Sequence, residues 1–224
     1  MYSIRRTANI VMPFNLLRYQ HILWDWNGTL VDDVALTIDV MNGMLARRDM
    51  PLLTDESYRH IFSFPIRNYY EQLGFDFTVE SCEDIGLEFF EEYGFRWRSC
   101  SLYDDVKAGL ERVARANIEQ SLLSAAHKGI LGAYVAHYGL SDYFTQVIGV
   151  ENWDASGKQV IGKRWIDSQD LDPVEVLLVG DTVYDSEVAH EMGVDCILID
   201  HGHQHREKLE HCGPQIFSSL TELC

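Results

Sequence analysis

Residues 176–185 read VLLVGDTVYD, an apolar run that ends in a glycine and two aspartates four positions apart. An uninterrupted apolar run of this length is typical of a strand buried on both faces, as in a parallel sheet covered by helices. The residues that follow such a strand lie at the carboxyl edge of the sheet, where α/β proteins bind their ligands. The stretch therefore predicts an α/β fold with Asp181 and Asp185 at the ligand-binding edge.

Other short apolar runs repeat this pattern along the chain, at 22–24, 122–123, 147–148 and 196–199. Stretches of helical character separate the later runs, near 130–138, 158–168 and 183–192. Strand–helix alternation from about residue 118 onward is typical of a doubly wound parallel sheet. We therefore expect a Rossmann-like core.

The segment between the first two strands is different, because 34–100 contains no convincing buried strand. Apolar residues recur there at helical spacing, in one set after a candidate N-cap at Asp32 or Asp33 and in a second set further on: Val34, Ile38, Met41, Leu45; Val79, Cys82, Ile85, Phe89, Tyr93. We therefore expect a helical insert. The predicted organisation is an N-terminal extension over 1–18, a core made of 19–33 and 101–224, and an α-helical cap over 34–100.

The composition excludes several classes of protein. The chain has 224 residues, of which 46% are hydrophobic, and 18 basic against 35 acidic residues give a net charge of −17. Neutralising nucleic-acid phosphates needs a basic face, so nucleic-acid binding is excluded, and anionic membrane surfaces are disfavoured. Five widely spaced cysteines and the absence of a long apolar run predict no disulfide framework and no membrane span, and favour a cytoplasmic location. The oligomeric state is not predicted.

Two charged stretches are interpreted without assigning them a function. Residues 1–24 contain no acid and carry three arginines, which faintly resembles a transit peptide, but an extension that precedes the fold is the favoured interpretation. Residues 76–105 carry nine acids and two arginines, a net charge of −7, and are expected to form a solvated helix surface.

A second candidate site is the stretch WDWNGTL at 24–30. Asn27-Gly28 is a strong hairpin signal, which leaves a plain β-hairpin open. Asp25, however, ends an apolar run and would lie at the same carboxyl edge as Asp181 and Asp185. Grouped carboxylates are suited to Mg²⁺, whereas a pair of helix-dipole acids would explain only one of the two later aspartates.

Together these segments resemble the haloacid dehalogenase-like hydrolase superfamily, in particular phosphoglycolate-phosphatase-like members with a helical cap. The resemblance rests on four motifs in order: Asp25-Trp26-Asn27-Gly28-Thr29, Ser124, Lys158, and Gly180-Asp181 with Asp185. The first and last motifs are specific, and the middle two are weak alone. The helical insert also falls where the family places its cap.

The resemblance implies a Mg²⁺-dependent phosphatase acting on a small phosphorylated metabolite. Asp25 would attack the phosphorus and carry an aspartyl-phosphate. The metal would be held by the Asp25 carboxylate, the Asn27 carbonyl, Asp181 and Asp185. Thr29, Ser124 and Lys158 would bind the phosphoryl group, with Ser121 and Lys163 as competitors for the last two roles, and Arg67 of the cap is a candidate substrate contact.

Asn27 departs from the family pattern, which has a second aspartate there as general acid and base. An amide cannot shuttle protons, and losing that help typically costs about 10²–10⁴ in rate. The chain would then be a slow enzyme, an enzyme for substrates with good leaving groups, or a protein that binds a phosphorylated ligand without turnover. Deamidation of the labile Asn27-Gly28 pair is a further alternative.

Three other patterns favour ordinary structural roles. The stretch at 157–163 fits the spacing of a phosphate-binding P-loop but is followed by Arg164 in place of Ser or Thr. Three histidines at 201, 203 and 205 are expected to lie in a surface loop, because so close a set cannot easily converge on one metal. The arginines at 47, 48, 59 and 67 are expected mostly to form surface salt bridges, although one could reach an anionic substrate.

Overall fold

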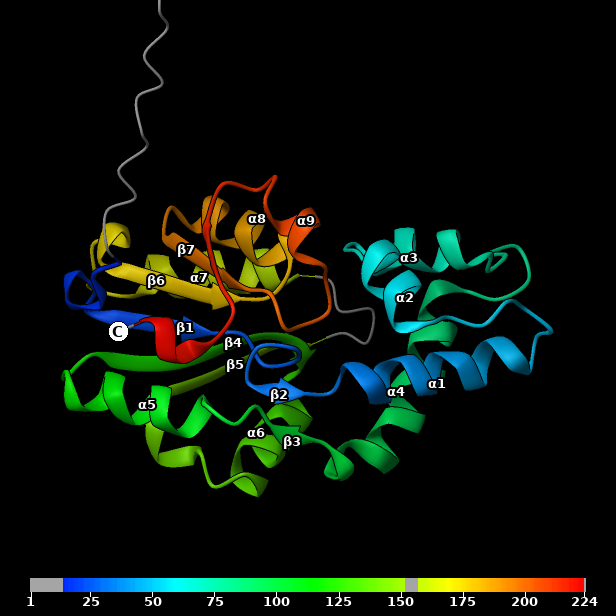
Figure 1. Cartoon of the computed structure of the whole chain (residues 1–224), viewed down its shortest axis with the longest axis horizontal. Helices are drawn as coiled ribbons and strands as arrows, with labels where there is room; N and C mark the ends of the chain where they lie inside the picture. The colour runs from blue at the N-terminus through cyan, green and yellow to red at the C-terminus, as the bar shows by residue number, and fades with distance from the viewer. Residues whose placement is uncertain (1–13, 152–156, 224) are drawn as a thin grey trace, which may run out of the picture.

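The structure is a computed structural model that describes residues 14–151 and 157–223. Its centre is a parallel six-stranded sheet in the order β5-β4-β1-β6-β7-β8 (Figure 1). The strands are β1 His21–Trp24, β4 Glu119–His127, β5 Gln146–Val150, β6 Val176–Gly180, β7 Asp195–Ile199 and β8 Gln215–Phe217. The predicted Rossmann-like α/β core is confirmed.

Both faces of the sheet are buried, which explains the uninterrupted apolar runs. Along β1, Ile22 and Trp24 belong to one hydrophobic cluster, and Leu23 belongs to another on the opposite face. The first face packs against α5 Val106–Arg115 and α6 Lys128–His137, and the second against α7 Lys158–Ser168 and α8 Val183–Met192 (Figure 1).

The stretch after β1 is not a hairpin, although Asn27-Gly28 is a hairpin signal. β1 lies between β4 and β6, and β2 Val31–Asp32 pairs instead with β3 Ser101–Leu102 in a separate two-stranded antiparallel sheet. A glycine is required in the connecting loop, because Gly28 has φ +71°. The chain thus leaves the core at β2 and returns to it at β3.

Four helices lie between β2 and β3 in sequence: α1 Val34–Ala46, α2 Asp55–Ile61, α3 Ile66–Leu73 and α4 Cys82–Arg96. They project beyond the ends of the core strands, at the right of Figure 1. The spacing of apolar residues predicts α1 and α4 closely. It does not reveal α2 and α3, which are one to two turns long and too short for a clear periodicity.

The remaining elements are short. They are α9 Arg206–Leu209 and five 3₁₀ turns at Leu16–Arg18, Trp97–Ser99, Ser141–Tyr143, Pro173–Glu175 and Leu220–Leu223. The first of these 3₁₀ turns lies within the predicted extension over 1–18. The end of that extension packs against the core, because Leu16 is buried and the Phe14 ring contacts Tyr19 and Phe217. Residues 1–13 of that extension lie outside the described part of the chain.

The sequence predicts neither a membrane span nor a disulfide framework. In the described ranges, no helix is both long and apolar enough to cross a membrane. The four cysteines described, at 82, 100, 196 and 212, form no disulfide with one another, whereas Cys224 lies outside the described residues.

Candidate active site

Three buried aspartates meet at the carboxyl edge of the sheet. Asp25 follows β1, Asp181 follows β6, and Asp185 lies in the first turn of α8; one carboxylate oxygen from each lies within 4.8 Å of the others. A hydrogen bond from the Asp25 backbone N–H to the Val179 carbonyl, 2.8 Å long, fixes β1 beside β6 at this level. The structure thus brings together the carboxylates of the two motifs that lie about 155 residues apart in sequence.

Lys158, the first residue of α7, completes this group. Its Nζ lies 2.5 Å from Asp25 Oδ1 and 2.5 Å from Asp185 Oδ1, and its side chain is 2% exposed. Burial would lower the pKa of Lys158, but the two carboxylates outweigh burial and hold the pKa above its usual value. The competing candidate, Lys163, is half-exposed and pairs with Asp167.

One lysine does not balance three buried carboxylates. Burial, with Asp185 and Asp181 adding to it, raises the pKa of Asp25 to about 8 despite the opposing charge of Lys158. Burial likewise raises the pKa of Asp181 to about 6. A cluster of oxygen ligands short of positive charge is chemically suited to a hard divalent cation such as Mg²⁺.

The Asp181 carboxylate occupies a narrow slot between two glycines. A Cβ atom at Gly28 would lie 2.4 Å from Asp181 Oδ2, and one at Gly202 would lie 2.1 Å from the same atom. Oδ1 accepts a hydrogen bond from the Thr29 hydroxyl (3.1 Å), and Oδ2 accepts one from the His203 backbone N–H (2.6 Å). Thr29 therefore orients Asp181 and does not line the cavity, in contrast to its predicted contact with phosphate.

Asp185 has two separate roles. Its Oδ2 accepts hydrogen bonds from the N–H and hydroxyl of Thr182 (3.0 and 2.6 Å), which caps α8, while Oδ1 contacts Lys158. Helix capping thus explains one oxygen of Asp185 and leaves the other in the site.

The structure also distinguishes the two serine candidates. Ser124 is buried and lines the same cavity as Asp25, at an irregularity in the pairing of β4 with β5 after Leu123. Ser121 lies within the sheet, where its hydroxyl contacts His21 and Thr145.

The Asn27 side chain is hydrogen-bonded to the carboxylate of Asp33, a contact that the sequence motifs do not indicate. Its Nδ2 lies 2.6 Å from Asp33 Oδ2, and the Tyr93 hydroxyl donates to the same oxygen at 2.9 Å. Asp33 Oδ1 accepts from the Gly28 N–H (3.0 Å). Asp33 occupies the predicted N-cap position of α1, but its side chain makes no capping hydrogen bond, because these contacts direct its carboxylate towards the site.

His203 is a second residue that the sequence interpretation missed, since its loop was expected to lie at the surface. It is 5% exposed, its Nε2 lies 3.3 Å from Asp33 Oδ1, and its Nδ1 lies 2.7 Å from the Tyr58 hydroxyl. Burial raises the pKa of Asp33, but the charge of His203 and hydrogen bonds from Asn27 and Tyr93 hold that pKa below its usual value. This loop therefore contributes to the site, and no spacing in the sequence indicates so.

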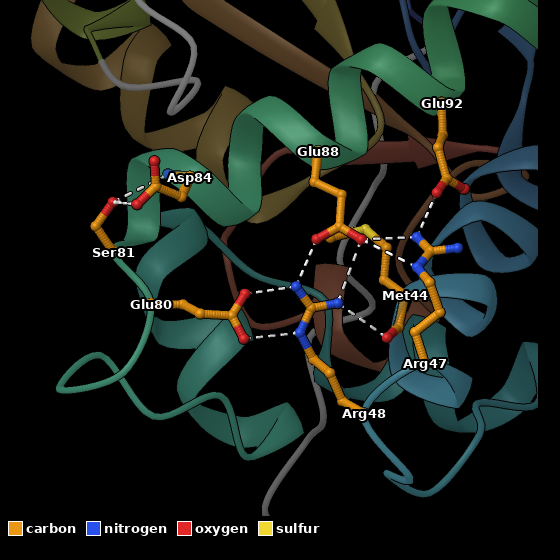
Figure 2. A network of polar contacts seen from close by, with 8 residues as sticks. All are labelled: Met44, Arg47, Arg48, Glu80, Ser81, Asp84, Glu88 and Glu92. Carbon is orange, nitrogen blue, oxygen red and sulfur yellow. Dashed lines mark hydrogen bonds and ion pairs between the residues drawn. The ribbon is translucent and has the colours of Figure 1, made fainter.

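The four arginines considered as substrate contacts, at 47, 48, 59 and 67, all have carboxylate partners. Arg47 and Arg48, just after the end of α1, reach Glu80, Glu88 and Glu92, so this part of the acidic stretch is paired and not simply solvated (Figure 2). Arg59 pairs with Asp55. Arg67, the predicted substrate contact, pairs with Glu71, lies over the Phe77 ring and does not line the cavity.

A cavity of about 120 Å³ lies between this group of polar residues and the helical segment. The polar residues of the site line one part of it: Asp25, Asn27, Asp33, Ser124, Lys158, Asp181, Thr182, Asp185 and His203. Aromatic and aliphatic side chains from α1–α4, α6 and α8 line the remainder.

Comparisons with known proteins find relatives that match most of the chain. The chain is 24% identical over 199 residues to an N-acetylmuramic acid 6-phosphate phosphatase of Pseudomonas putida, covering 85% of this chain and 87% of the relative. It is 23% identical over 212 residues to a phosphoglycolate phosphatase of Vibrio parahaemolyticus, covering 90% and 93%. The crystal structure of a predicted phosphatase from Clostridium acetobutylicum superposes with a TM-score of 0.79 at 20% identity, covering 92% of this chain and 96% of that one.

The family profile of the haloacid dehalogenase-like hydrolases matches residues 22–199. The matched range begins in β1, includes all three site aspartates and Lys158, and ends with β7. The chain is therefore a member of the haloacid dehalogenase-like hydrolase family.

Proposed function

We propose that this protein is a phosphoric monoester hydrolase in which Asp25 is the nucleophile. The observation that carries the proposal is the buried contact of 2.5 Å between Asp25 Oδ1 and Lys158 Nζ, at the carboxyl edge of the sheet and open to the cavity. A carboxylate paired with a fixed cation at such an edge can bind a phosphoryl group and react with it.

The proposed reaction has two steps. An Asp25 oxygen bonds to phosphorus while the ester oxygen departs with its electron pair, which leaves an aspartyl-phosphate and an alcoholate or phenolate. Water then attacks the phosphorus, the bond to Asp25 breaks, and orthophosphate is released as the water protons pass to solvent and to the departed oxygen. Lys158 and Ser124 hold the phosphoryl oxygens, whose negative charge needs fixed positive groups in both steps.

Mg²⁺ fits the donor set described above. We assign to it the Asp25 carboxylate, the Asn27 carbonyl and Asp181, with Asp185 in support. When bound, the ion would supply the positive charge that the three carboxylates lack and would neutralise charge on the phosphoryl group.

We assign residues 34–100 the role of a cap and residues 19–33 and 101–224 that of the hydrolase core. The cap side chains close the far side of the cavity, which would exclude water and select the substrate. The two named relatives are phosphatases of different small molecules, which supports a small phosphorylated metabolite as substrate here.

Asn27 favours a second candidate function, that of a protein which binds a phosphorylated ligand with little or no turnover. The Asn27 amide is too weak an acid and too weak a base to transfer protons in catalysis, and its Nδ2 donates a hydrogen bond to Asp33. This candidate predicts ligand binding with no release of orthophosphate.

The experiment compares wild type with Asp25→Asn and with Asp32→Asn, an exposed acid that serves as the matched control. Orthophosphate release is measured with Mg²⁺ and a panel of small phosphate monoesters. Asp25→Asn should lower the rate by roughly 10⁴-fold or more, as expected for a nucleophile, and Asp32→Asn should leave it unchanged. Activity that survives Asp25→Asn would contradict the assignment. An inactive wild type whose Tm rises with orthophosphate and Mg²⁺ would favour the binding protein.

A further inference from the structure

The cavity next to Asp25 is apolar on the side where the substrate's leaving group would lie. Its wall there is made largely of rings, among them Tyr58, Phe62, Phe64, Tyr69, Phe89 and Tyr134. The cavity volume of about 120 Å³ is somewhat smaller than the roughly 150 Å³ of an engineered apolar cavity that takes up benzene. The space therefore suits a compact, ring-sized apolar group.

Among the described residues, the cavity lining offers an anionic leaving group no cation that is free of a carboxylate partner. Among the cavity-lining residues that the structure describes, Lys158 is the only lysine or arginine, and its ammonium group is shared by Asp25 and Asp185. His203 is held by Asp33 and Tyr58. A carboxylate on the leaving group would thus be buried without a partner of its own and near other carboxylates, which is strongly unfavourable.

One hydroxyl in the wall lacks a partner. Tyr69 is 1% exposed, and its hydroxyl makes no hydrogen bond within the described residues. A buried unpaired hydroxyl is destabilising, and a polar group on the ligand that accepts its hydrogen bond would remove that cost. The hydroxyl is thus available to hydrogen-bond a polar substituent of the ligand.

Asn27 restricts the leaving group in a second, independent way. Without a carboxylic acid at this position, the ester oxygen departs unprotonated. A phenol has a pKa of about 10, like tyrosine, whereas an aliphatic alcohol is about as weak an acid as water, whose pKa is about 16. A phenolate is therefore the far better unprotonated leaving group.

We infer that the substrate is an aryl phosphate, the monoester of a one-ring phenol that carries no charged substituent. This inference rests on the proposed function and specifies the substrate class of the same site. In the first step the bond between phosphorus and the phenolic oxygen breaks as the bond to Asp25 forms, and the phenolate takes up a proton from solvent after it leaves. The rings of the helical segment select the aryl group, and the site residues handle the phosphoryl group as above.

Two matched pairs of substrates test the inference through kcat/KM of the wild type with Mg²⁺. Phenyl and cyclohexyl phosphate share ring size but differ in leaving-group acidity, and phenyl phosphate should be favoured by about 10²–10⁴-fold, the usual contribution of the missing acid. The 4-carbamoylphenyl and 4-carboxyphenyl phosphates differ in charge, and the carbamoyl compound should be favoured by at least 10-fold. Equal values within the first pair, or a preference for the carboxylate in the second, would overturn the inference.

A variant of the wall provides a second measurement. Ile66, at the start of α3, lines the cavity, and Ile66→Arg should shift the preference of the second pair towards the carboxylate by at least 10-fold. Val79→Arg, on an exposed residue of the same segment, is the matched control and should leave the preference unchanged. An unchanged preference in a folded Ile66→Arg variant would contradict the placement of the leaving group.

The wild type alone separates failure of this inference from failure of the proposed function. Wild type that hydrolyses phosphoglycolate but no aryl ester would refute the substrate class alone, whereas wild type inactive on every monoester would refute the proposed function.

Discussion

The molecule contains two clusters of acidic and basic side chains in very different surroundings. In the site, Lys158 is 2% exposed and contacts two carboxylates of a buried group of three. Between α1 and α4, Arg47 and Arg48 contact three glutamates at the surface, and the Arg47 side chain is 48% exposed (Figure 2). Both sets of contacts have similar lengths, so distance does not distinguish them.

Burial is what separates the two clusters. Charges removed from water interact strongly and cannot be left unpaired, whereas exposed pairs are screened and typically contribute only 0.2–1 kcal/mol. In the first cluster an excess of negative charge is maintained where water is excluded, as expected of a site that binds a cation and a phosphoryl group. The second cluster has a structural role, because it joins α4 and the preceding loop to α1.

The comparison predicts the largest effect for Lys158→Met. This variant leaves three buried carboxylates without their lysine, so activity should fall by about 10³-fold or more and the free energy of unfolding by about 3–5 kcal/mol. Orthophosphate release and urea unfolding measure the two effects. Mg²⁺ should restore more stability to the variant than it adds to wild type, because it would replace the missing charge. Lys163→Met, which removes the half-exposed lysine of the same helix, is the control, and equal losses in both variants would refute the contrast.

A second prediction concerns the contact between Asn27 and Asp33 beside the buried cluster. Asn27→Asp alone would place two carboxylates across the present 2.6 Å contact and should destabilise the protein by about 1–3 kcal/mol with little gain in rate. The Asn27→Asp/Asp33→Asn double variant exchanges the acid and the amide. It should recover that stability and raise kcat/KM for alkyl phosphates by about 10²-fold, since an acid then lies beside the leaving oxygen.

The wild type and the three variants of this cycle, including Asp33→Asn alone, are compared by thermal unfolding and by hydrolysis of cyclohexyl phosphate. Additive changes in stability would show that the two side chains do not interact. A gain in rate from Asn27→Asp alone that equals the gain of the double variant would show that Asp33 does not restrain position 27.

The residues of the site differ in how well the sequence predicts their positions. Asp25, Asp181 and Asp185 follow apolar runs, so the motifs that flank those runs predict where the three carboxylates meet. Lys158 follows no such run and is indicated only by the resemblance to the family. Asp33, which binds Asn27, and His203, which binds Asp33, are different. Asp33 is at a helix start, where acids are common caps, and His203 is in a loop whose histidine contacts Tyr58. These contacts depend on the packing of α2 and of the loop after β7 against the core, and no local pattern in the sequence records that packing.

The smallest predicted effect belongs to the surface cluster. Arg48 contacts both Glu80 and Glu88 and is 19% exposed, so Arg48→Met should cost about 1 kcal/mol, and Arg47→Met, at a more exposed residue, about half as much. Both losses should shrink as salt is raised from 0.05 to about 1 M, because exposed charges are screened within about 3 Å at the higher concentration. The measurement is urea unfolding at the two salt concentrations, together with kcat on phenyl phosphate, which should not change. A loss from Arg48→Met that persists at high salt would mean that this pair is effectively buried, and a fall in kcat would mean that the tie between α1 and α4 also sets the shape of the cavity.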